Sequence, residues 1–196
     1  ELEIPTHEDL QKIAAMPEHC EDLAQQYDLE LNFLTSLIWS PHTAEVIHAL
    51  VGTSDRSRQP ADRLPLSTPL FLREEHRTIF AAVIELADSG SLITPVLVQA
   101  HLSATGGHRT LTPLLLEIAA PTGHAPLPGG VDTPSLAGAL VAAWYRRGYR
   151  TLTDRMNAVL LDEPTPTLSG HWDSLTSHKN TADKRWRSVQ SALNSL

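Results

Sequence analysis

The chain has 196 residues and a formal net charge of −8 at pH 7, and hydrophobic residues make up 41% of it. This composition is typical of a folded globular protein and excludes general disorder, while the acidic balance disfavours nonspecific binding to duplex DNA, which depends on Lys and Arg. The single cysteine excludes an intramolecular disulfide framework and indicates a reducing compartment. No run reaches the roughly 18 apolar residues of a membrane helix and the first ten residues lack the features of a signal peptide, so we predict a cytoplasmic protein without membrane association.

Prolines and glycines mark the predicted helix boundaries. A polar residue directly before proline is the pattern of a helix start, because proline at the first helical position loses no hydrogen bond. The four such sites are Ser40-Pro41, Thr94-Pro95, Thr112-Pro113 and Thr133-Pro134. Glycine in a left-handed conformation commonly ends a helix, and the candidate ends are Gly52, Gly90 and the pair Gly106-Gly107. Together these signals predict an all-α protein.

The first half of the chain contains three predicted helices. One covers residues 7–26 and is interrupted by Pro17, and a second covers residues 29–39 with its apolar residues on one face. A short third helix ends near Gly52. Residues 53–67 are polar and carry prolines without an apolar period, which predicts a loop.

The clearest core helix lies within residues 72–90. Its apolar residues are spaced so that they form one broad face, and they are Ile79, Phe80, Val83, Ile84 and Ala87. Two shorter helices are predicted over residues 95–104 and 113–119. A connector rich in proline and glycine follows at residues 121–130, and we expect it to act as a hinge.

Two long heptad patterns occupy the last third of the chain. Residues there that are apolar at every position but Lys179 recur at alternating gaps of four and three, which predicts two helices with one seam each. The seams are Gly138, Ala142, Tyr145, Tyr149, Leu152, Met156 and Val159 in the first segment, and Leu168, Trp172, Leu175, Lys179, Ala182, Trp186, Val189 and Leu193 in the second. The two prolines of DEPTPT, residues 162–167, cannot lie inside a continuing helix, so the two arms must fold back on each other.

The predicted organisation therefore has three parts. Residues 1–27 form a helical N-terminal extension, residues 28–130 a small helical bundle with a polar loop at 53–67, and residues 131–196 a long antiparallel helical hairpin. The hairpin carries more aromatic surface than two helices can bury alone. Either it packs back onto the bundle, or, as we favour, it meets a second copy of itself in a four-helix dimer interface.

No motif for catalysis is present in the sequence. The strings G-x-x-x-x-G-K-[ST], G-x-S-x-G and H-E-x-x-H do not occur, and ten histidines are scattered along the chain. His171 and His178 lie two helical turns apart, which is too far for joint metal ligation. Glu74 and Glu75 stand where carboxylates complement the dipole at a helix start. We therefore predict no catalytic residue, cofactor or metal site, and a buried, hydrogen-bonded structural role for His76.

Basic residues gather in two segments of the hairpin. They are Arg146, Arg147, Arg150 and Arg155 in the first, and Lys179, Lys184, Arg185 and Arg187 in the second. We interpret them as solvated helix faces, which disfavours direct DNA binding. The alternative is a helical nucleic-acid-binding protein that uses these faces to contact phosphates.

Three motifs, in their order, resemble the N-terminal domain of the bacterial replicative DNA helicase, the DnaB family, over residues 29–160. They are LELNFLTSLIWSP, then FLREEHRTIFAAVIELADSG with Phe71, Glu75, His76, Arg77, Ile79 and Phe80 in matching places, and then VLVQAHLSATGGHRTLTPLLLEIAAPT. The polar loop resembles an insertion, Thr110 stands where the family usually has an aromatic residue, and residues 1–27 have no obvious counterpart. The resemblance is to a divergent member.

The resemblance implies a noncatalytic module of DNA replication. It implies a homodimer formed through the hairpin, which can build a higher ring, with primase or helicase-loader proteins as further partners. The protein would be either independent or the regulatory domain of an ATP-dependent helicase whose motor is a separate domain. Lys179 would need an acidic partner or a route to solvent. The candidate dimer residues are Tyr145, Tyr149, Leu152, Met156, Trp172, Leu175, Trp186 and Val189.

Overall fold

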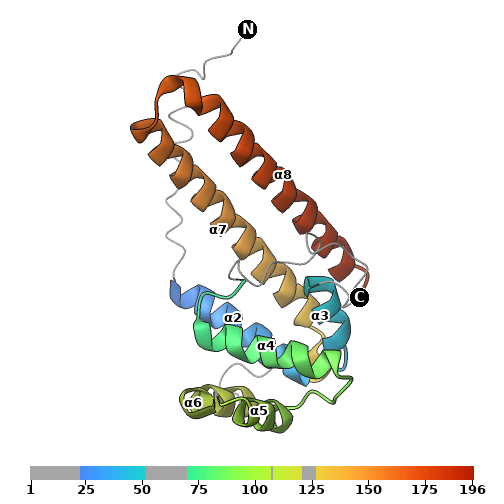
Figure 1. The fold of residues 1–196 in the computed structure, drawn as a ribbon. Helices are drawn as coiled ribbons and strands as arrows, with labels where there is room; N and C mark the ends of the chain where they lie inside the picture. Colours follow the sequence, from blue (N-terminus) through green and yellow to red (C-terminus); the bar gives the residue numbers. More distant parts are fainter. Residues whose placement is uncertain (1–22, 52–69, 107, 121–126) are drawn as a thin grey trace.

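The structure is a computed structural model that describes residues 23–51, 70–106, 108–120 and 127–196, all of which form helices and their connections (Figure 1). The α-helices are α2 (Leu23–Trp39), α3 (Thr43–Val51), α4 (Glu74–Asp88), α5 (Pro95–Ala104), α6 (His108–Ala119), α7 (Thr133–Asp162) and α8 (Leu168–Leu193), with 3₁₀ turns η2 (Pro128–Gly130) and η3 (Thr165–Thr167). This confirms the prediction of an all-α fold with a long C-terminal hairpin. The predicted loop at 53–67 and most of the predicted helix at 7–26 lie outside the described residues.

Three phenylalanines form the centre of the bundle. Phe33 from α2, Phe71 from the turn before α4, and Phe80 from α4 are all buried, with ring centroids 5.0 to 6.1 Å apart. Aromatic rings at such separations contribute packing energy beyond the area that they bury. Ile79 and Val83 are buried on the same side of α4, so the predicted core face of this helix is confirmed.

Two helices begin earlier than the sequence indicated. α2 starts at Leu23 and not at residue 29, and α6 starts at His108 although Pro113 was predicted to open it. The longer α6 places Leu111 on the same buried stripe as Leu115 and Ile118. Burial of that extra leucine offsets the single backbone hydrogen bond that a proline inside a helix cannot make.

The signals beside α4 and α5 act as expected, whereas α3 begins at Thr43, two residues after Pro41, and Gly52 and Gly107 lie outside the described residues. The Thr94 hydroxyl accepts a hydrogen bond from the Leu97 backbone at 3.3 Å and so caps α5, directly before the proline. Gly90 and Gly106 have φ angles of 68° and 87°, which places them in the left-handed conformation after α4 and α5.

The connector before α7 is fixed to the bundle at its C-terminal end. Ser36 of α2 donates a hydrogen bond of 2.6 Å to Asp132, and the Thr133 hydroxyl donates one of 2.7 Å to the Gly130 carbonyl. Gly130 has a φ of 60°, and a Cβ atom at this position would lie 2.7 Å from the Ser40 Cβ. Only glycine fits here, so this end of the predicted hinge is anchored, while residues 121–126 lie outside the described part.

The hairpin is joined to the bundle along its lower half (Figure 1). The first half of α7 packs across α2 and buries Leu140, Val141 and Trp144, and the end of α8 packs against α3 and buries Val189 and Leu193. The upper half of the hairpin projects beyond the bundle, and the arms are joined by η3 where DEPTPT predicted the reversal. None of the described helices combines the length and apolarity needed to cross a bilayer.

Candidate functional site

The predicted dimer residues fall into two groups, of which the first packs within the chain. Near the bundle, Tyr145 of α7 stacks on Trp186 of α8 with ring centroids 5.3 Å apart. Val189, one turn further along α8, is only 7% exposed and belongs to the hydrophobic core. A heptad pattern identifies a seam but not the helix that fills it. Here Tyr145 and Trp186 cover each other across the two arms and the hydrophobic core covers Val189, so in this conformation Val189 has no surface to offer a partner.

The second group lies on the projecting half of the hairpin and remains accessible. Trp172 is 58% exposed and Tyr149 is 37% exposed, while Leu152, Met156 and Leu175 are half-buried. Only two helices meet at this level, so each seam is covered from one side and open on the other. We call these five residues the distal seam. An accessible group of this kind on a projecting element is typical of an interaction surface.

A polar cluster connects the two arms at the base of the distal seam. The Tyr145 hydroxyl donates a hydrogen bond to the Asp183 carboxylate, and the Tyr149 hydroxyl donates to the same oxygen at 3.3 Å. Lys179 lies 3.1 Å from the other oxygen of Asp183. This ion pair supplies the acidic partner that Lys179 was predicted to need. Asp183 was not among the predicted site residues, although its position four residues after a lysine on one helix was a usable signal.

The pKa values of the cluster reflect these contacts. The hydrogen bond to Asp183 raises the pKa of the Tyr145 hydroxyl well above its usual value, because ionisation would remove the proton that the hydroxyl donates to the carboxylate. The hydrogen bond from Tyr145, followed by the one from Lys179, lowers the pKa of Asp183. The cluster therefore holds a neutral tyrosine and an ionised aspartate at neutral pH.

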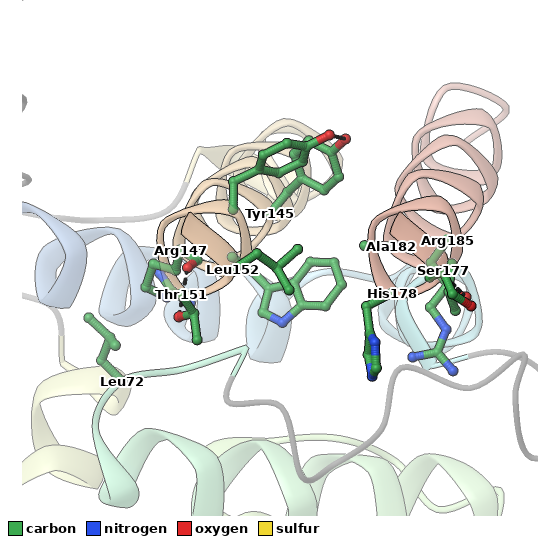
Figure 2. A pocket seen from close by; sticks show the side chains of 13 residues that line it. Leu72, Tyr145, Arg147, Thr151, Leu152, Ser177, His178, Ala182 and Arg185 are labelled. Atoms are coloured by element: carbon green, nitrogen blue, oxygen red, sulfur yellow. Dashed lines mark hydrogen bonds between the residues drawn. The ribbon is translucent and has the colours of Figure 1, made fainter. Parts of the chain in front are cut away.

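A groove of about 780 Å³ lies between α7 and α8 beside the bundle. Its walls include the apolar side chains of Leu72, Trp144 and Leu152, and the basic residues Arg147, His178 and Arg185 also line it. Figure 2 shows Tyr145 on one side of the space between the helices and Leu72 on the other, with His178 and Arg185 projecting from α8 on the side away from Tyr145. We call this space the hairpin groove. Neither heptad pattern indicated it, because a seam pattern does not reveal where two arms diverge.

The basic residues of the hairpin differ in their surroundings. Arg146, Arg155 and Arg187 are exposed, as the prediction of solvated faces requires. Arg147 is instead half-buried and ties α7 to the bundle, since it donates hydrogen bonds of 3.0 Å to the Gln26 side chain and 2.7 Å to the Leu70 carbonyl.

A buried acid–histidine pair stands at the start of α4. Glu30 of α2 and His76 of α4 are both fully buried, and the His76 Nδ1 lies 2.7 Å from the Glu30 carboxylate. The same carboxylate accepts backbone hydrogen bonds from Leu72 at 2.5 Å and Arg73 at 3.4 Å. The predicted burial and cross-bundle hydrogen bond of His76 are confirmed. Because the carboxylate is occupied by donors of the turn before α4, the pair joins α2 to α4. Among the described residues, no group of three acidic, histidine or cysteine side chains is arranged to hold a metal ion.

These features define an all-α domain in which a small bundle carries a long hairpin with an accessible apolar seam. The model of the DnaB-like helicase N terminal domain family matches residues 22–122, just over half of the 196 residues. The chain therefore belongs to the DnaB-like helicase N-terminal domain family. The matched region covers α2 to α6 and ends before α7, so the hairpin lies outside it. No curated protein and no solved structure matches the chain.

Proposed function

We propose that this chain is a noncatalytic module of DNA replication that self-associates through the distal seam of its hairpin. Membership of the DnaB-like N-terminal domain family supports the link to a replicative helicase. The observation that carries the self-association is the exposure of Trp172 on a hairpin that projects from its own bundle. Proteins of the primase or helicase-loader type are the further partners in this proposal, and its setting is the cytoplasm.

The distal seam suits a second copy of the same hairpin. The two antiparallel arms of one hairpin leave one apolar side open. A two-fold axis that brings two such sides together produces a four-helix bundle, in which each seam contacts both the other arm of its own hairpin and the hairpin of the second copy. Trp172 and Tyr149 are residue types that dominate binding energy in protein interfaces. The half-buried Leu152, Met156 and Leu175 would complete the interior of that bundle.

The test compares the mass of the native protein with that of two variants of α8. Trp172→Glu places a charge in the distal seam, and Ser174→Glu places the same charge on an exposed residue two positions later. Loss of a central interface tryptophan costs at least about 2 kcal/mol, which weakens dimerisation roughly 30-fold. In sedimentation equilibrium we expect dimeric native protein and Ser174→Glu, and monomeric Trp172→Glu with unchanged helical circular dichroism. Equal dimerisation of both variants would remove the distal seam from the proposal.

The alternative function is nucleic-acid binding by the hairpin. Residues 133–193 carry eight Lys or Arg and five Asp or Glu, a net charge of +3 within an acidic chain. Exposed Arg146 and Arg187 are available to phosphates. Binding of this kind weakens as salt rises, with a slope set by the number of phosphates contacted. A salt-dependent affinity for single- or double-stranded DNA that falls in an Arg146→Glu, Arg187→Glu variant would favour this alternative.

A further inference from the structure

One side of the hairpin carries two exposed apolar residues near its tip. Tyr149 of α7 and Asp183 of α8 mark this side, since they share a hydrogen bond of 3.3 Å across the arms, and we call it the open side. Leu160 lies eleven residues beyond Tyr149 on α7, and its side chain is 53% exposed. Trp172 lies eleven residues before Asp183 on the antiparallel arm and is 58% exposed. Eleven residues make three helical turns, or about 16 Å, so both residues stand on the open side at the same level.

Two arginines occupy the open side at the base of the hairpin. Arg146 stands three residues before Tyr149, and Arg187 stands four residues after Asp183. These spacings place each arginine on the same helix face as its neighbour, one turn closer to the bundle. Both arginines are exposed, and they lie about 20 Å below the apolar pair near the tip. The open side is therefore basic at the base and apolar near the tip.

The charges of the whole hairpin follow the same division. Residues 133–150 and 177–193, which form the base, carry seven Lys or Arg and one Asp, a net charge of +6. Residues 151–176, which form the tip half, carry one Arg and four Asp or Glu, a net charge of −3, and all five are exposed. A second hairpin laid parallel would set like charges against each other at both ends. An antiparallel second hairpin sets opposite charges together at both ends, which favours this orientation.

The projecting length of the hairpin fits the antiparallel orientation (Figure 1). Trp144 is the last buried residue of α7 and the chain reverses at η3, so about 20 residues of α7, or about 30 Å, project from the bundle. When two such lengths overlap in opposite directions, the tip of each hairpin stops where the bundle of the other begins. The middle of this length lies close to Thr153, an exposed residue seven positions from both Arg146 and Leu160.

We propose that a second copy of the chain docks antiparallel on the open side, with the two-fold axis beside Thr153. Each Trp172 is then covered by Arg187 of the second copy, and each Leu160 packs against the aliphatic stem of Arg146 of the second copy. Tryptophan is the ring that binds a cation most strongly, and arginine is the cation most often found over it. The inference rests on the proposed self-association and adds to it an orientation and the arginines that the second copy contributes.

Lys179 is compatible with this arrangement although it lies beside the axis on α8. It stands seven residues after Trp172, at the level of Thr153, so the two copies of Lys179 approach each other. The Asp183 carboxylate of the same chain lies 3.1 Å from each ammonium and balances its charge. The pair therefore brings no net charge to the centre of the interface.

Disulfide trapping in the full chain tests the orientation. Single cysteines are introduced into a Cys20→Ser background, and the proteins are oxidised with glutathione disulfide at micromolar concentration. A residue beside a two-fold axis meets its own copy, so Thr153→Cys should give a covalent dimer in high yield. Arg146→Cys should give little, because its two copies lie about 20 Å apart, whereas a disulfide needs Cα atoms about 4.4–6.8 Å apart. A mixture of tagged Arg146→Cys with untagged Leu160→Cys should give the mixed covalent dimer.

Arg155 supplies the matched control for both the trapping and the arginine contact. It is exposed and lies at the level of the axis, but it stands one turn beyond Thr151, which lines the hairpin groove away from the open side. Arg155→Cys should therefore give little covalent dimer. In sedimentation equilibrium, Arg187→Ala should weaken dimerisation about tenfold, because each dimer loses two contacts with Trp172, while Arg155→Ala should leave it unchanged.

The outcomes separate this inference from the proposed function. A high yield of covalent dimer from Arg146→Cys alone would mean that the hairpins lie parallel, which overturns the orientation and leaves self-association through the distal seam intact. Equal yields from Thr153→Cys and Arg155→Cys would also overturn it, since the second copy would then show no preference for the open side. A monomeric native protein without trapping at any position would overturn the inference and the proposed function together.

Discussion

Removal of the Glu30 carboxylate is expected to destabilise the bundle more than any other single change at a charged residue of α2. In Glu30→Ala, the buried His76 Nδ1 and the part-buried backbone N–H groups of Leu72 and Arg73 lose their common acceptor. A buried donor left unpaired costs about 1–3 kcal/mol, and three donors lose the same acceptor here, so we expect a loss of about 3–5 kcal/mol in all. Against a typical stability of about 5–15 kcal/mol, this is a large fraction.

Urea denaturation followed by circular dichroism measures the effect. We expect the free energy of unfolding to fall by about 3–5 kcal/mol and the melting temperature by about 10 °C. Asp28→Ala is the matched control, since Asp28 is an exposed carboxylate on the same helix, and its change should stay within about 0.5 kcal/mol. If Glu30→Ala and Asp28→Ala have the same stability, the carboxylate does not join α2 to α4 as described.

Two further predictions concern single contacts. Tyr145 should remain protonated above pH 10 while its hydrogen bond to Asp183 persists. Because the pKa is raised in the folded state, the contact stabilises the fold at pH values below the ordinary tyrosine pKa, and this contribution is lost as the pH rises through the raised pKa. In Asp183→Asn, the tyrosinate absorbance of Tyr145 should appear at lower pH. An unchanged titration would contradict the contact. Gly130→Ala should lower the melting temperature more than Gly129→Ala does. Both glycines have positive φ, but only at Gly130 would an added Cβ lie 2.7 Å from the Ser40 Cβ. Equal losses would show that the close approach is relieved without cost.

Local patterns predicted the helices well where one physical cause dominated. The proline-marked reversal at 162–167, the caps of α5 and the apolar face of α4 all appear in the structure, because each depends on residues close together in the sequence. The start of α6 was predicted wrongly for the opposite reason. Its limit is set by the burial of Leu111 against the rest of the bundle, and tertiary packing overrides the signal of Pro113.

The candidate site was predictable only in part. Heptad spacing identified the seam residues, but it could not distinguish Val189, which the chain itself buries, from Trp172, which it leaves exposed. That difference arises because the bundle supports only the lower half of the hairpin, which is a property of the whole fold. The hairpin groove and Asp183 were missed for the same reason: both depend on how two distant arms lie against each other.

The native mass of the full chain in solution tests the central claim most directly. Self-association through the distal seam predicts a dimer, or a multiple of it, in sedimentation equilibrium at micromolar concentration, with dissociation on dilution. Charged substitutions of Tyr149 and Trp172 should yield monomers that keep their helical content. A native protein that remains monomeric at micromolar concentration would contradict the account.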